Sequence, residues 1–132
     1  MKCPVCRERS LYVVEHDDIE LDVCATCEGV WFDAGELDLL LGGETPRALA
    51  AASPAGEGAR PCPRCRRTMD KMNIGSAGGV VIDVCTDSRC GLWFDRGELR
   101  ALCRDLTATG WDQDPAVLKF LSEVFPEAPA GA

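Results

Sequence analysis

Apolar and polar side chains alternate along two stretches of the chain, and each stretch is followed by a short helical pattern. Alternation of this kind is typical of strands with one buried face. Asp17-Asp18 interrupts the first stretch as a turn, and a glycine-rich segment over residues 75–79 interrupts the second. A third short strand is expected at residues 31–32 and again at 93–94. The pattern therefore predicts two modules, each a three-stranded sheet with one helix. The apolar positions that carry the alternation are Leu11, Val13, Ile19, Leu21 and Val23, then Met72, Ile74, Val80, Ile82 and Val84.

The two stretches belong to an internal duplication. One copy runs from Cys3 to about Leu41, and the other runs from Cys62 to about Cys103. Both copies open with Cys-Pro-x-Cys, continue to Asp-Val-Cys and close with Trp-Phe-Asp-x-Gly-Glu-Leu. A repeated motif of this length excludes coincidence, so we expect the same fold twice.

The segments outside the copies have a different composition. Residues 43–59 are rich in Gly, Ala, Ser and Pro, which is typical of a linker. Within them Thr45 as N-cap and Pro46 as first helical residue predict one or two helical turns through Ala52. The predicted organisation is a first module over residues 1–42, a linker over 43–59, a second module over 60–104 and a tail over 105–132.

The tail carries one amphipathic helical pattern. Asp114-Pro115 is a helix start signal, and five apolar residues follow at helical spacing before Pro126. We expect this helix to fold onto one of the modules; docking on a second copy or on a partner, as a helix in a groove, is the alternative. The apolar positions are Val117, Leu118, Leu121, Val124 and Phe125.

Nine cysteines among 132 residues set the chemistry. The sequence has neither an apolar run long enough to span a membrane nor a signal-peptide pattern, so we expect a cytoplasmic protein. Clustered cysteines in a reducing compartment hold metal more often than they form disulfides. A module of about 40 residues also buries too little apolar surface to fold without a metal or a cross-link.

Eight of the cysteines have the spacing of metal ligands. The first copy reads C-x2-C-x17-C-x2-C, and the second reads C-x2-C-x19-C-x4-C. Four thiolates complete a tetrahedral zinc site, which makes the site structural because no position is left for a catalytic water. Iron of the rubredoxin type is the alternative metal. The predicted ligands are Cys3, Cys6, Cys24 and Cys27 in the first site and Cys62, Cys65, Cys85 and Cys90 in the second.

With these motifs the chain resembles the transcription-factor-IIB-type zinc-ribbon family found in bacterial proteins. The resemblance is close over residues 3 to about 41 and looser over 62 to about 103, where the turn from Cys85 to Cys90 is longer than the family pattern. It implies two Zn²⁺ ions held by the paired cysteines. The expected fold is a small metal-stabilised α+β protein: two tandem zinc ribbons, each with a three-stranded antiparallel sheet, two cysteine knuckles and one short helix, plus a C-terminal helix.

The charge distribution limits the partners. The formal net charge is −8, and four-thiolate zinc centres would make the loaded protein more acidic. Binding of nucleic acid through a broad basic surface is therefore disfavoured, and only the basic patch from Arg60 to Lys71 offers a local anionic contact. One residue of each Trp-Phe pair should be buried and its neighbour exposed, because successive strand residues point to opposite faces. The candidate binding residues are Arg64, Arg66, Arg67, Trp31 and Trp93.

Little in the sequence indicates catalysis. His16 is the single histidine and is expected at the surface beside the Asp17-Asp18 turn. The Asp-x-x-Glu pairs that precede each short helix fit helix capping, and no motif for a small-molecule substrate occurs. We therefore expect a non-catalytic, zinc-binding interaction module with a protein partner, and the family resemblance implies a relation to transcription.

Two alternatives remain open at this stage. One is nucleic-acid binding through the Arg60–Lys71 patch. The other is a thiol redox or zinc-release switch that uses Cys103 and the looser second site. The residue Cys103 itself occupies an apolar helix position, which favours a small buried side chain over a reactive thiol.

Overall fold

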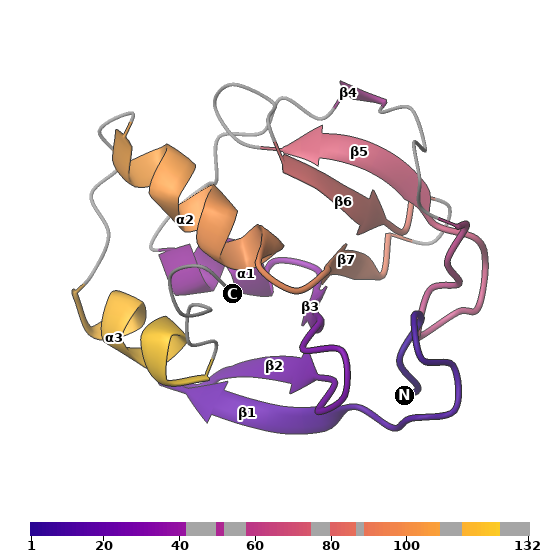
Figure 1. Cartoon of the computed structure of the whole chain (residues 1–132), viewed down its shortest axis with the longest axis horizontal. Helices are drawn as coiled ribbons and strands as arrows, with labels where there is room; N and C mark the ends of the chain where they lie inside the picture. The colour runs from indigo at the N-terminus through magenta and orange to yellow at the C-terminus, as the bar shows by residue number, and fades with distance from the viewer. Residues whose placement is uncertain (42–49, 52–57, 75–79, 87–88, 109–114, 125–132) are drawn as a thin grey trace, which may run out of the picture.

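In the computed structural model the chain forms one curved antiparallel sheet with helices packed on its concave side (Figure 1). The strand order is β1-β2-β3-β7-β6-β5-β4, so the two repeats lie side by side and β3 meets β7 at the centre. The structure describes residues 1–41, 50–51, 58–74, 80–86, 89–108 and 115–124.

The strands and helices of each repeat lie where the hydrophobic pattern predicts them. Each repeat has three strands and a helix, which confirms the predicted modules, and a further helix follows in the tail. The strands are β1 (Tyr12–His16), β2 (Ile19–Val23), β3 (Val30–Asp33), β4 (Ala50–Ala51), β5 (Asp70–Ile74), β6 (Val80–Val84) and β7 (Gly91–Phe94). The helices are α1 (Glu36–Leu41), α2 (Glu98–Ala108) and α3 (Pro115–Val124).

The hairpin of the first repeat turns at the predicted aspartates. His16 pairs with Ile19, so only Asp17 and Asp18 form the loop. Both have positive φ angles, 45° and 67°. Two consecutive left-handed residues are the requirement of the tight turn that matches the twist of a hairpin, and Asp tolerates this conformation better than most side chains.

The two repeats join edge to edge through their third strands. Trp31 pairs with Trp93 in an antiparallel register, flanked by Val30 opposite Phe94. Because these strands carry the same motif, the pairing relates the repeats by an approximate twofold axis between the two tryptophans. The hydrophobic pattern predicts two separate sheets, and the pairing of β3 with β7 joins them into one.

Both faces of the central strands are covered. Phe32 and Phe94 pack edge to face, with ring centroids 5.5 Å apart, in the core between the sheet and the helices. Trp31 and Trp93 point to the opposite face, where they pack with the cysteines. All four side chains are fully buried. The expectation that one residue of each pair is exposed for binding is therefore wrong, because the cysteine loops cover the face that would otherwise meet solvent.

Two glycines allow the tryptophans to pack across the junction. A Cβ atom at Gly29 would lie 2.1 Å from Cζ2 of Trp93, and one at Gly91 would lie 2.9 Å from Cζ2 of Trp31. Real Cβ contacts are not that short, so neither position has room for a side chain. The indole of each repeat thus occupies the space over the other repeat's glycine.

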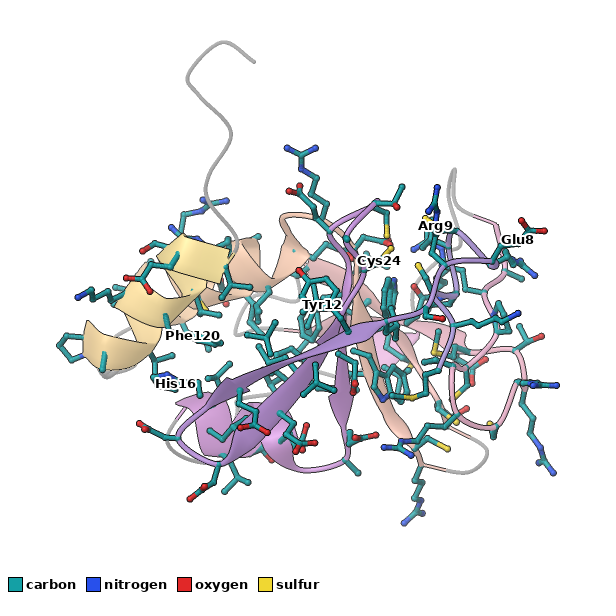
Figure 2. All side chains as sticks on the ribbon, turned by 90° about the horizontal axis from the view of Figure 1, so that it is seen from below. Glu8, Arg9, Tyr12, His16, Cys24 and Phe120 are labelled. Carbon is teal, nitrogen blue, oxygen red and sulfur yellow. The ribbon has the colours of Figure 1, made fainter. Side chains whose placement is uncertain are left out.

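The tail helix folds onto the first repeat, as expected. Val117 and Leu121 of α3 are buried in the core between sheet and helices. Phe120 stacks on His16 at the end of β1, with ring centroids 4.5 Å apart and planes 21° apart (Figure 2). The His16 side chain is 18% exposed and is therefore less of a surface residue than expected.

The structure differs from the sequence-based expectation at the end of α2 and at residues 50–51. Helix α2 continues to Ala108, beyond the predicted end of the second module at residue 104. Ala50 and Ala51 form strand β4 against β5 and not the predicted helical turn. The edge of β5 offers backbone N–H and C=O groups that an extended segment can pair with, which overrides the local capping signal. The rest of that predicted turn, residues 45–49 and 52, lies outside the described residues.

Candidate metal centres

The first loop of each repeat folds tightly around its first cysteine. The backbone N–H groups of Val5 and Cys6 point at the sulfur of Cys3, with N to Sγ distances of 3.4 and 3.3 Å. The N–H of Arg7 donates to the carbonyl of Cys3 at 2.8 Å, and Arg7 has a φ angle of 67°. This loop therefore presents N–H dipoles to a thiolate, which stabilises its negative charge.

The second loop of the first repeat connects β2 to β3. The N–H of Cys24 donates to the carbonyl of Gly29 at 3.0 Å, and the N–H of Glu28 donates to the carbonyl of Cys24 at 2.9 Å. Glu28 takes a φ angle of 60°, which closes the turn. The pairing of β2 with β3 closes this turn, and the Sγ atoms of Cys3 and Cys27 show that it lies against the first loop.

The four sulfurs of each repeat meet at one point. Within each set the Sγ atoms all lie within 4.8 Å of one another. The Sγ atoms of Cys3 and Cys27 are 3.6 Å apart, and those of Cys6 and Cys24 are 3.9 Å apart. A tetrahedral centre with sulfur ligands at ~2.3 Å has sulfur–sulfur edges of about 3.8 Å, so the cluster has the dimensions of a four-thiolate zinc site. The two clusters contain the eight predicted ligands, Cys3, Cys6, Cys24, Cys27, Cys62, Cys65, Cys85 and Cys90.

The second centre repeats this backbone geometry. Arg66 donates its N–H to the carbonyl of Cys62 at 2.8 Å and has a φ angle of 66°, as Arg7 does in the first repeat. Cys90 joins its cluster although the loop from Cys85 is longer than in the first repeat. Residues 87–88 of that loop lie outside the described residues. The insertion therefore leaves the grouping of the four sulfurs intact.

The family comparison agrees with these two centres. A family model described as the transcription factor zinc-finger, the TFIIB-type zinc ribbon, matches residues 2–42 and 61–105. The chain belongs to this zinc-ribbon family. The matched segments are the two repeats, so each repeat is one zinc ribbon with four cysteines. No curated protein and no solved structure matches the chain.

Burial dominates the electrostatics of the first cysteine in each zinc ribbon. Cys3 and Cys62 are each 1% exposed. Burial raises the pKa of both thiols above the ordinary value, against the lowering effect of the local N–H groups. These thiols are protonated at neutral pH without a cation, so a metal ion must displace protons when it binds.

A contact repeated in both zinc ribbons ties the tryptophan to the start of the helix. The indole N–H of Trp31 donates to Asp33 at 3.0 Å, and that of Trp93 donates to Asp95 at 3.1 Å. The Glu that follows reaches back as expected for a capping box: Asp95 N–H donates to Glu98 at 2.6 Å. The aspartate carboxylates thus accept hydrogen bonds from the buried indoles, in addition to the capping role that the Asp-x-x-Glu pattern predicts.

The predicted basic patch is largely an internal charge network. Arg64 reaches across the junction and binds Asp33 of the other zinc ribbon through both Nε and a terminal nitrogen, the latter at 2.7 Å. Arg60 contacts Asp95 and lies 3.3 Å from Asp83. This network leaves only part of the patch facing solvent.

Lys71 belongs to the same network. Its ammonium lies 2.6 Å from Asp83, and the two residues are 8% and 1% exposed. Arg66 and Arg67 are exposed. Of the predicted binding residues, the structure therefore places Trp31 and Trp93 in the interior, Arg64 in an ion pair, and Arg66 and Arg67 at the surface.

Cys103 lies apart from both centres. It is 4% exposed in α2 and packs in the core between sheet and helices. Burial raises its pKa to about 11. A thiol with this pKa is protonated at neutral pH, so Cys103 has the properties of a small buried apolar residue.

Proposed function

We propose that the chain is a non-catalytic interaction module in which two Zn²⁺ ions hold the tandem ribbons as a docking scaffold for a macromolecular partner. The observation that carries the proposal is the pair of four-sulfur clusters, whose dimensions suit zinc. Membership of a family named for transcription factors supports a transcription-related assembly and zinc over iron. We place the protein in the cytoplasm because free thiols persist in a reducing compartment. None of the described helices is long and apolar enough to span a membrane.

The closed ligand sets support a structural role for the metal. Four protein sulfurs fill a tetrahedral shell, and a catalytic zinc needs an open position for water or substrate. His16, the single histidine, is stacked on Phe120 and lies away from Cys24 (Figure 2). The protein's one histidine is therefore not placed to act as a general base at the first centre.

Two observations count against the other candidate functions. Arg60, Arg64 and Lys71 bind carboxylates of the same chain, which weakens the Arg60–Lys71 patch as a nucleic-acid surface. Cys103 is buried and has a raised pKa, which weakens it as a sensing thiol. We therefore favour a protein partner.

Native mass spectrometry of protein purified without added metal tests the zinc part of the proposal. We expect two zinc ions per chain in the wild type and one in Cys6→Ser, because a site that loses one thiolate loses most of its affinity. Cys103→Ser is the matched control and should keep both ions. Bound iron, or a metal-free protein with its cysteines in disulfides, would overturn the proposal.

A further inference from the structure

An open groove of about 730 Å³ lies between the first cysteine loops of the two ribbons. Both loops approach each other at the side of the molecule opposite the helices, near the N-terminus (Figure 1). The side chain of Arg7 bridges them by donating to the carbonyl of Ala59 at 3.3 Å. The groove is lined by both repeats, which the pairing of β3 with β7 joins. Its lining residues are Met1, Lys2, Cys3, Pro4, Arg7, Ser10, Pro61, Cys62, Pro63, Arg64 and Arg66.

The groove follows the approximate twofold symmetry of the molecule. Cys3-Pro4 of one ribbon faces Cys62-Pro63 of the other. Arg7 and Arg66 occupy equivalent positions at the ends of the two loops, with φ angles of 67° and 66°. Equivalent arginines therefore extend from both sides of one groove.

The groove is basic in an acidic protein. Four of its lining residues, Lys2, Arg7, Arg64 and Arg66, are exposed cations, of which Arg64 is paired with Asp33, and none of the lining residues is Asp or Glu. The formal net charge of the whole chain is −8. The metal-binding cysteines of the groove are each 1% exposed, so they form its floor and a ligand meets the cations first.

We propose that this groove binds a carboxylate-rich segment of a partner protein. The inference rests on the proposed function and names the chemistry of the partner. Arginine forks match carboxylates with paired hydrogen bonds, and Arg64 already holds the Asp33 carboxylate in this way at the edge of the groove. Pro4 and Pro63 provide apolar walls for the peptide between the charges.

Three features favour an acidic peptide over nucleic acid. The lining residues include no aromatic side chain on which a base would stack. Four cations in one short groove are few for a phosphate backbone, whose affinity depends on many contacts. The acidic remainder of the molecule repels a long polyanion but not a short segment that fits the groove.

Fluorescence anisotropy with zinc-loaded full-length protein tests the proposal. The probes are a short labelled peptide of alternating Glu and Ala, its Gln counterpart and a single-stranded DNA of similar length. The test variant is Arg7→Gln/Arg66→Gln. The control is Arg9→Gln/Arg67→Gln, which removes the same charge from exposed arginines outside the groove but on the same two loops.

We expect the Glu peptide to bind, the Gln peptide and the DNA to bind more weakly, and the groove variant to lose about tenfold in affinity, as for the loss of one or two charge-assisted hydrogen bonds. The control should change affinity less than about threefold, the effect of a screened long-range charge. Equal losses in both variants, tighter binding of DNA, or no peptide binding would overturn the inference. Native mass spectra of the same samples separate the two proposals: with two zinc ions present, failure to bind the peptide contradicts the groove and leaves the zinc scaffold standing.

Discussion

At the scale of single residues, the junction between the two ribbons depends on a glycine, because a side chain at that position would collide with the other ribbon. Gly29 has no side chain, and the indole of Trp93 occupies the space where one would be. Trp93 in turn is held by its N–H bond to Asp95 at 3.1 Å. A buried indole with its N–H satisfied contributes a large apolar contact without an unpaired donor. Gly29, directly before β3, therefore determines how Trp93 of the other ribbon packs.

Gly29→Ala should destabilise the protein by about 1–3 kcal/mol, because a methyl group there must displace a fully buried ring. Gly58→Ala is the matched control, since a Cβ atom at Gly58 meets no heavy atom within 4 Å. Denaturant unfolding of the zinc-loaded proteins measures both changes. Equal stability of the two variants would show that the indole does not rest on Gly29.

Because Cys103 is a buried thiol, we expect the protein to lose stability at alkaline pH. Its pKa rises from an ordinary value of 9.0 to about 11 through burial. Between these values the thiol ionises in the unfolded chain but not in the folded one, so its contribution is complete below about pH 9 and is lost as the pH rises toward 11, by ~2–3 kcal/mol at most. Cys103→Ala should lack this loss. The measurement is the free energy of unfolding of both proteins at pH 8 and pH 10.5. An equal decrease in the two proteins would contradict the raised pKa of the Cys103 thiol.

At the scale of elements, one row of side chains crosses the sheet and shows where the ribbons differ. Asp22 of β2 pairs with Val13 of β1, and Asp83 of β6 pairs with Lys71 of β5. Both aspartates are buried, at 8% and 1% exposure. Burial raises the pKa of Asp22, with a further contribution from Asp33. Only the second ribbon supplies a cation on the neighbouring strand.

Val13→Lys should therefore stabilise the first ribbon by about 0.2–1 kcal/mol, the range of a cross-strand ion pair. Val13 is 54% exposed, so the longer side chain has room to extend. Val13→Gln is the neutral reference, and Val13→Glu should be less stable than it because like charges would oppose each other. A thermal melt of the three variants orders them, and a Lys variant no more stable than the Gln variant would contradict the prediction.

The sequence predicts local structure well and contacts between distant segments poorly. The cysteine loops, hairpins and helices follow from local spacing, because their signals lie within a few residues of each other. The pairing of Trp31 with Trp93 joins two segments far apart in sequence, and no periodicity encodes it. The Arg64–Asp33 contact and the burial of both tryptophans follow from that pairing. Gly29 is the one signal before β3 that points to it, since a glycine beside a strand often marks close packing.

At the scale of the whole molecule, the tandem ribbons share one sheet and one hydrophobic core. Their shared core contains side chains from both repeats and from α3. Each metal centre anchors the loop next to a central strand: Cys27 precedes β3, and Cys90 precedes β7. A change at one centre is therefore expected to reach the other through paired strands.

Loss of the first metal should accordingly loosen the second ribbon at β7. In Cys6→Ser, amide hydrogen exchange should accelerate at Leu92 and Phe94, whose backbone groups face β3, because β7 loses the strand that pairs with it on that side. The reciprocal variant Cys65→Ser should accelerate exchange at Phe32, whose backbone groups face β7, through the same pairing. Amides in the β5–β6 pair serve as the internal reference for Cys6→Ser, since that hairpin does not contact β3 in the sheet order. Unchanged protection at Leu92 and Phe94 after loss of the first metal would mean that the second ribbon is stable without the first, and that the junction joins two folded units.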